Sequence, residues 1–249
     1  MKFQKWMMVC MVAGLALSAQ AGLTHRYDFE SDANDFAEAA TARDGTLSAN
    51  GSGTEEPDFT TDIPTNAITS FASKSIKLGM SVGTNASFVN FGSGAQTKIY
   101  DGKSGSVAYW FKPNQVLNGR ELLSNISGLR NLTLNSGGLR LAGSALGSNQ
   151  DFFTTGGAVA GTWNHLVLTW DDSAGQGTIA LNGVTATYVQ TAAGSLVDPS
   201  RLMLGNFSNN GSQLGTQFDG YFYDLQIYDH ELTASEIAKL AAYPGLMAD

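Results

Sequence analysis

The stretch from Gly161 to Asp171 reads GTWNHLVLTWD, and its pattern indicates the fold class of this 249-residue chain. Apolar and polar side chains alternate along it, as they do on a β-strand whose two faces differ in burial. A turn rich in small and polar residues, Asp172 to Gly177, leads into a second alternating run that ends at Asn182-Gly183. Turn residues of this kind between two alternating runs are typical of a β-hairpin. The sequence therefore predicts an antiparallel pair of strands here.

Similar short runs continue in both directions along the chain, separated by Gly, Ser, Asn and Asp. Eleven of them are predicted strands: His25–Phe29, Ser75–Leu78, Ser87–Phe91, Ser106–Lys112, Glu121–Asn125, Asn131–Leu134, Leu139–Ala142, His165–Trp170, Thr178–Leu181, Arg201–Leu204 and Tyr221–Tyr228. Many short strands with turns between them are typical of an all-β sandwich of antiparallel sheets. The run 106–112 carries bulky side chains on both faces, which favours a central strand between two layers.

One helix is predicted, close to the C-terminus. Thr233 is a good N-cap, and Glu236 follows three residues later, as in a capping box. Ile237 and Leu240 then form an apolar stripe, and Pro244-Gly245 ends the helix. The sequence thus predicts an all-β sandwich with a short C-terminal helix.

The first 21 residues have the features of a Sec signal peptide. Lys2 and Lys5 precede an apolar run from Trp6 to Leu17, and Ala19-Gln20-Ala21 forms a cleavage site. The run is shorter than the roughly 20 apolar residues that span a membrane. We therefore expect a secreted or periplasmic protein that is not inserted in a membrane after cleavage. Residues 22–249, with no linker or repeat among them, are predicted to form a single domain.

Composition excludes several classes of function. The chain has 14 Lys and Arg against 22 Asp and Glu, for a formal net charge of −8. Removal of Lys2 and Lys5 with the signal gives 12 minus 22, or −10. Since no basic face is visible, nucleic acid is not an expected partner. The one cysteine, Cys10, lies in the signal, which excludes disulfides, thiolate zinc sites and cysteine nucleophiles in the mature chain. We expect a monomer stabilised by its core.

The motif at 161–171, together with Ile179 to Gly183, resembles the laminin-G-like domains of the concanavalin A-like lectin/glucanase group. Further pieces resemble the family in the expected order, at 23–30, 107–113, 218–228 and 232–237. The resemblance spans residues 23 to about 240. It implies a two-sheet antiparallel jelly roll, whose relatives bind carbohydrate or protein or act as enzymes on glycans. Fold alone does not choose among these functions.

The sequence lacks the catalytic motifs of the enzymes in this group. Glycosidases of this fold use two carboxylates that flank the scissile bond. The E-x-D-x-x-E strand of the glucanase relatives is absent, and the acids at Glu55, Glu56 and Asp58 lie in a loop broken by Pro57. We therefore predict a non-catalytic, exported, lectin-like domain that binds a glycan or polysaccharide, at residues that the sequence does not identify. The alternatives are a protein-binding adhesion or surface-assembly module and a divergent polysaccharide-degrading enzyme.

The resemblance also implies a structural calcium ion where the first and last strands meet. Calcium prefers carboxylate and carbonyl oxygens. The candidate ligands are Asp28, Glu30 and Asp35 near the start and Asp224 near the end. However, Tyr223 stands where the family has its first aspartate, and on a period-two strand Tyr223 and Asp224 would point to opposite faces. A calcium site and ordinary solvated acids therefore both remain open.

The tryptophans and His165 have two interpretations each. Trp110, Trp163 and Trp170 could be stacking platforms for sugars, but each is placed in an alternating strand, which favours core packing. His165 is expected to be a buried, hydrogen-bonded side chain beneath a loop and not a catalytic base.

Overall fold

The structure is a computed structural model that describes residues 22–36, 44–50, 57–81, 85–93, 104–125, 131–143, 146–171, 173–190, 201–206 and 216–248. The predicted signal peptide, residues 1–21, lies outside the described residues. Within these ranges, no helix is long and apolar enough to cross a membrane.

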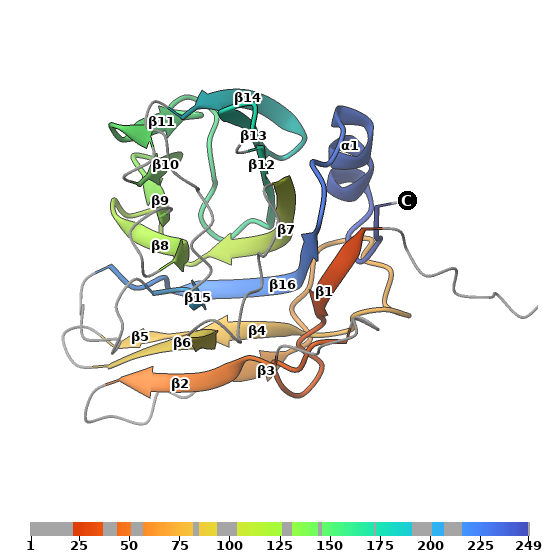
Figure 1. The fold of residues 1–249 in the computed structure, drawn as a ribbon. Coiled ribbons are helices and arrows are strands. Elements are labelled where there is room, and N and C mark those ends of the chain that lie inside the picture. Colours follow the sequence, from red (N-terminus) through yellow and green to blue (C-terminus); the bar gives the residue numbers. More distant parts are fainter. Residues whose placement is uncertain are drawn as a thin grey trace, which may run out of the picture.

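The described strands form two antiparallel eight-stranded sheets, as the sequence predicts (Figure 1). Sheet A has the order β14-β13-β12-β7-β16-β4-β3, and β1 pairs with β16. Its strands are β1 (Leu23–Tyr27), β3 (Asp58–Thr60), β4 (Ser75–Leu78), β7 (Ser104–Pro113), β12 (Asn164–Asp171), β13 (Gln176–Leu181), β14 (Val184–Val189) and β16 (Gly220–Tyr228).

Sheet B has the order β11-β10-β9-β8-β15-β6-β2, and β5 pairs with β6. Its strands are β2 (Thr46–Asn50), β5 (Met80–Ser81), β6 (Asn85–Ser93), β8 (Arg120–Asn125), β9 (Asn131–Asn135), β10 (Gly138–Ala142), β11 (Gln150–Phe152) and β15 (Arg201–Leu204). The two sheets together form the predicted jelly-roll sandwich.

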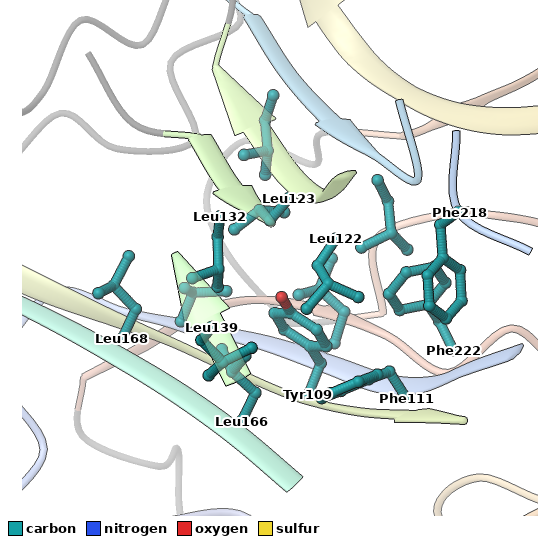
Figure 2. Packing of buried hydrophobic residues seen from close by; sticks show 14 of the residues in the cluster. Tyr109, Phe111, Leu122, Leu123, Leu132, Leu139, Leu166, Leu168, Phe218 and Phe222 are labelled. Atoms are coloured by element: carbon teal, nitrogen blue, oxygen red, sulfur yellow. The ribbon is translucent and has the colours of Figure 1, made fainter. Parts of the chain in front are cut away.

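The main core lies between the two sheets (Figure 2). Sheet A contributes aromatic side chains such as Tyr109, Phe111 and Phe222, and sheet B contributes leucines such as Leu122 and Leu139. All five are 1% exposed or less. Since the sequence has no cysteine after Cys10, this apolar burial is the main stabilising term in the fold.

The outer face of sheet A is partly covered by α1 (Ala234–Ala242). The helix begins with the predicted capping box, in which Thr233 and Glu236 satisfy each other's backbone amides. Ile237 and Leu240 pack with Val167 of β12 and Ala180 of β13 in a second apolar cluster. The predicted helix is therefore confirmed, and it protects only one part of this face.

All eleven predicted strands correspond to observed ones, and five observed strands were not predicted. These are β2, β3, β5, β11 and β14, each of which has three residues or fewer or lies at an edge of a sheet. The strand β14 follows directly from Asn182-Gly183, which have φ values of 52° and 81° and form a two-residue hairpin turn. From the sequence we predict only that this pair ends a strand, although the residues that follow, Val184–Val189, also alternate between apolar and polar.

A buried acid lies in sheet B. Glu121 of β8 is opposite Thr133 of β9 and is 5% exposed, and its Oε2 has no hydrogen-bond partner among the described residues. Burial raises the pKa of this carboxyl from 4.5 to about 8. At neutral pH the folded protein therefore holds Glu121 as the uncharged acid.

We predict that this carboxyl makes stability pH-dependent. Between about pH 4.5 and 8 the folded state binds a proton that the unfolded state has lost, so stability falls as the pH rises through this range. Glu121→Gln, which cannot ionise, should reduce that decline. Urea unfolding of both proteins at pH 5 and pH 8 measures it. Parallel pH profiles for the two proteins would contradict the prediction.

Candidate functional site

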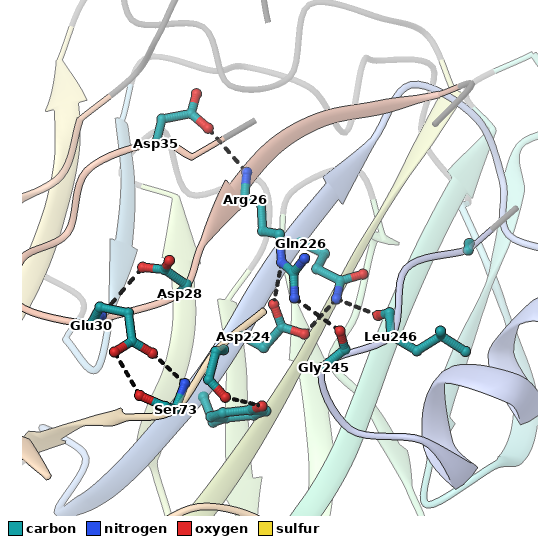
Figure 3. A network of polar contacts seen from close by, with 12 residues as sticks. Arg26, Asp28, Glu30, Asp35, Ser73, Asp224, Gln226, Gly245 and Leu246 are labelled. Carbon is teal, nitrogen blue, oxygen red and sulfur yellow. Dashed lines mark hydrogen bonds and ion pairs between the residues drawn. The ribbon is translucent and has the colours of Figure 1, made fainter. Parts of the chain in front are cut away.

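The four predicted calcium ligands lie near the junction of β1 and β16, where they bind groups of the chain itself (Figure 3). Asp224 of β16 accepts a hydrogen bond of 2.7 Å from Nε of Arg26 on β1. Its other oxygen accepts one of 2.6 Å from Nε2 of Gln226. Arg26 and Asp224 are each 2% exposed, so this is a buried ion pair that joins the first and last strands of the sheet.

The other three acids also have partners in the chain. The Glu30 carboxylate accepts hydrogen bonds from the amide and hydroxyl of Ser73 and from the amide of Lys74. Asp28 accepts a bond of 3.2 Å from the amide of Glu30, and burial, opposed by that bond, raises the pKa of its carboxyl.

Asp35 fastens the segment that follows β1. Its Oδ1 accepts a bond of 3.0 Å from the amide of Arg26, and its Oδ2 lies 2.6 Å from Nδ1 of His25. The side chain of Asp35 is fully buried by these contacts. Asp35 therefore binds the backbone and the histidine of β1, and its carboxylate does not point toward that of Asp224 (Figure 3).

A β-bulge in β16 changes the expected geometry of Tyr223 and Asp224. Asp224 has a φ of 50°, and the pairing of β16 with β7 shifts between Tyr223 and Gln226. Phe222 and Leu225 both belong to the main core, with Tyr223 and Asp224 between them on the outer side. The expectation that Tyr223 and Asp224 point to opposite faces is therefore wrong, because the bulge interrupts the period of two.

The four acids do not form a cage that fits calcium as they stand. Calcium takes six to eight oxygens around one point. Here Asp224, Glu30 and Asp35 each have carboxylate oxygens occupied by donors of the chain, and a guanidinium lies beside Asp224. Within the described ranges, no three His, Cys, Asp or Glu side chains are grouped so that they could hold a metal ion. Calcium binding itself stays a prediction.

A second polar group lies on the outer face of sheet A, away from α1. Trp163, just before β12, packs against Tyr221 and Tyr223 of β16, with ring centroids 6.3 Å and 6.2 Å away. The ammonium of Lys112 on β7 lies 4.3 Å from the Tyr221 ring centroid and 5.5 Å from that of Trp163. Asp62 contacts the same ammonium and accepts a bond of 3.3 Å from Nε1 of Trp163.

We call Trp163, Tyr221, Lys112 and Asp62 the aromatic patch. The strand register brings three of its members together. Tyr221 of β16 pairs with Lys112 of β7. Asn164, the residue after Trp163, pairs with Phe111, the residue before Lys112. Trp163 and Tyr221 are half-buried, and the Asp62 side chain is 40% exposed. The patch thus presents half-buried aromatic rings and a carboxylate to the solvent, with the Lys112 side chain, 13% exposed, directly beneath them.

The interpretation of the tryptophans as core residues is confirmed for Trp170 and wrong for Trp163 and Trp110, which are half-buried. Trp170 is 1% exposed and belongs to the main core. Trp163 precedes β12, is half-buried and belongs to neither apolar cluster. The alternation of the sequence extends through Trp163 and predicts a strand there, whereas the pairing of β12 with β7 begins at Asn164. Trp110 is also half-buried and contacts His165, with centroids 5.0 Å apart.

His165 is buried as expected, at 2% exposure. Burial lowers the pKa of its imidazole to about 3, so the ring is neutral. It lines a cavity of about 10 Å³ with Trp110, Asp224 and Gln226, which is room for one water. Nδ1 of His165 has no hydrogen-bond partner among the described residues, so the expected hydrogen bond of its ring is not seen at that atom.

Sequence reasoning missed three members of the patch. Lys112 could have been noticed as a cation on the solvent face of an aromatic strand, and Tyr221 as an aromatic on the outer face of the last strand. Asp62 lies 101 residues before Trp163, and no local pattern connects the two.

The fold and this surface define a jelly-roll domain with an aromatic patch on one sheet. A family model for the concanavalin A-like lectin/glucanases superfamily matches residues 83–238, which is more than half of the chain. The chain belongs to this superfamily. A search of curated protein sequences finds no match.

Solved structures show the same fold at low sequence identity. Domain 4 of AbnA, an extracellular arabinanase of family GH43 from Geobacillus stearothermophilus, was solved in complex with arabinotriose. It is 21% identical, with a TM-score of 0.64, over 89% of this chain and 99% of that domain. The binding domain of botulinum neurotoxin serotype D/C is 16% identical, with a TM-score of 0.59. The match covers 90% of this chain and 53% of the neurotoxin domain.

The half-buried position of Trp163 generates a prediction about stability. Trp163→Ala should cost about 1–2 kcal/mol, below the roughly 3–5 kcal/mol of a fully buried tryptophan, because part of the ring is already in water. Trp170→Ala, from the core, is the matched comparison and should show the larger cost. Urea unfolding of both variants measures the difference. Equal losses in the free energy of unfolding would show that Trp163 packs as a core residue.

Proposed function

We propose that the chain is an exported, non-catalytic domain that binds neutral carbohydrate at the aromatic patch. The observation that carries the proposal is the half-buried Trp163–Tyr221 pair with Lys112 and Asp62 directly beside the rings. Ligand sites combine apolar and aromatic surface with a few polar groups that set orientation. The patch has this composition.

The chemistry of a sugar fits both parts of the patch. The C–H groups on one face of a sugar ring make an apolar surface that packs on an aromatic ring, as other apolar groups do. Its hydroxyls both donate and accept hydrogen bonds. The Asp62 carboxylate, 40% exposed, accepts from a hydroxyl, and the Lys112 ammonium donates to one. Adjacent hydroxyls can therefore use both members of this ion pair.

The charges around the patch favour a neutral ligand. Lys112 is already paired with Asp62. The next lysine on this face, Lys77 of β4, pairs with Tyr221 on one side and with Asp58 on the other. The charges of Lys77 and Lys112 are therefore balanced by those of Asp58 and Asp62. The chain as a whole carries −8, and −10 after the predicted cleavage, which disfavours an acidic glycan.

The structural neighbours support a carbohydrate ligand in general terms. The AbnA domain carries arabinotriose, and the cell entry of botulinum neurotoxin type C depends on interaction with two ganglioside molecules. Another neurotoxin domain was solved with rat synaptotagmin II, which keeps a protein ligand as the alternative function. The sugar is favoured here because the patch has few apolar atoms beyond its rings and is polar at its centre.

A binding function without catalysis agrees with the side chains at the patch. Hydrolysis of a glycosidic bond by the usual mechanism needs two carboxyl groups on either side of that bond. In the aromatic patch, as the described residues form it, Asp62 is the one carboxylate, so the patch lacks the second carboxyl group of such a pair. We therefore propose that the domain retains a glycan and does not cleave it.

We predict that the patch is needed for binding. A glycan array of the purified protein should show neutral oligosaccharides among its ligands. Trp163→Ala and Tyr221→Ala should each weaken binding about tenfold or more, since each removes a stacking surface worth roughly 1–3 kcal/mol. Calorimetric titration with the best array ligand measures the effect.

The matched control is Tyr243→Ala, which removes an exposed aromatic residue at the end of α1, outside the patch. It should leave the affinity unchanged. Binding that survives both patch variants would place the site elsewhere. A protein ligand with no sugar bound on the array would support the alternative function.

We also predict that binding is insensitive to ionic strength. A ligand without charge does not displace counterions and is not steered by long-range attraction, so salt has little to screen. The dissociation constant should change less than about twofold between roughly 0.05 and 0.5 M NaCl. A steep loss of affinity with added salt would instead indicate an acidic glycan held by Lys77 and Lys112.

A further inference from the structure

We infer that the guanidinium of Arg26 takes the place of a metal ion at the junction of the first and last strands. The chain would then carry its own cation at this junction, and the domain would need no calcium to hold β1 against β16. This inference does not depend on the ligand of the aromatic patch.

The position of Arg26 is the first reason. It lies on β1 and is 2% exposed. Nε donates to Oδ1 of Asp224 on β16 at 2.7 Å, and Nη2 donates to the carbonyl of Gly245 at 3.0 Å. The Arg26 side chain thus connects the first strand to the last strand and to the segment after α1, both of which lie far from it in the sequence (Figure 3).

The electrostatic surroundings are the second reason. The charge of Asp28 interacts unfavourably with the charges of Glu30 and Asp224. Arg26 interacts favourably with Asp28 and forms the ion pair with Asp224. The Phe71 ring, whose centroid is 5.3 Å from the guanidinium carbon, adds a cation–π contact. A cation is therefore required at this junction, and Arg26 supplies it.

The saturation of Asp224 is the third reason. Its Oδ2 accepts from Nε2 of Gln226, which also donates to the carbonyl of Leu246 at 2.7 Å. A metal ion bound to Asp224 would have to displace a buried guanidinium and an amide. That would leave the Arg26 charge without its counterion in a low-dielectric site, which is strongly unfavourable.

The decisive experiment compares thermal melts of the purified protein in excess EDTA and in millimolar calcium. We expect superimposable curves, because the cation at the junction is covalently part of the chain. A domain with a structural calcium site would gain stability with rising calcium concentration. A melting temperature that falls in EDTA and recovers with calcium would overturn the inference, and this test needs no variant.

Variants then test whether the charge of Arg26 is what matters. Arg26→Met keeps most of the length of the side chain and removes its charge, and should lower the melting temperature by on the order of 10 °C because Asp224 is left buried and unpaired. Arg26→Lys restores the cation and should recover part of that loss. Equal melting temperatures for Arg26→Met and Arg26→Lys would show that Arg26 acts by packing alone, and would overturn the inference.

The chain offers a matched control in a second arginine–aspartate pair. Arg140 donates to Asp151 at 2.7 Å and 2.9 Å, but this pair is exposed on sheet B. Arg140→Met should shift the melting temperature by at most about 3 °C, as expected for a surface pair. A loss as large as that of Arg26→Met would mean that burial gives Arg26 no special role, and would overturn the inference.

Discussion

The bulge at Asp224 is the constraint on which both polar groups of sheet A depend. A φ of 50° is uncommon outside glycine but is among the conformations that aspartate tolerates, and the Asp224 side chain forms the buried ion pair with Arg26. The extra residue puts Tyr223 and Asp224 on the same outer side of β16. Tyr223 then supports the ring of Trp163, while Asp224 fastens β1. One irregularity in one strand thus connects the closure of the sheet with the candidate ligand surface.

The outer face of sheet A is divided between a part that α1 covers and a part that holds the aromatic patch. At one end α1 and the segment that follows it cover Val167 and Ala180 and bind Arg26 and Gln226. At the other end the aromatic patch is left open to the solvent. The strand β16 is paired with β1 on one side and with β7 on the other. It thereby supports the half-buried rings of the aromatic patch from both neighbouring strands. Two of the patch residues, Lys112 and Tyr221, lie on paired strands, which position side chains more firmly than loops do.

The apolar core and the polar groups of this chain occupy separate parts of the sandwich. Its core is built from alternating apolar residues that any jelly roll would need. Arg26 at the strand junction and the Asp62–Lys112 pair beside Trp163 lie outside the two apolar clusters, the first buried and the second partly exposed. Function can change there without loss of the fold.

Sequence alone determined the sandwich, the C-terminal helix and the family, because periodicity, turn residues and the capping box are local properties. Alternation correctly favoured core packing for Trp170. It failed at Asp224 and Trp163, where a bulge and the start of a strand interrupt the period of two, and such interruptions depend on the partner strands. Tertiary structure alone decided that Arg26 meets Asp224, 198 residues away, and that Asp62 meets Trp163. No short-range pattern encodes such contacts, because they arise only when distant strands are packed side by side.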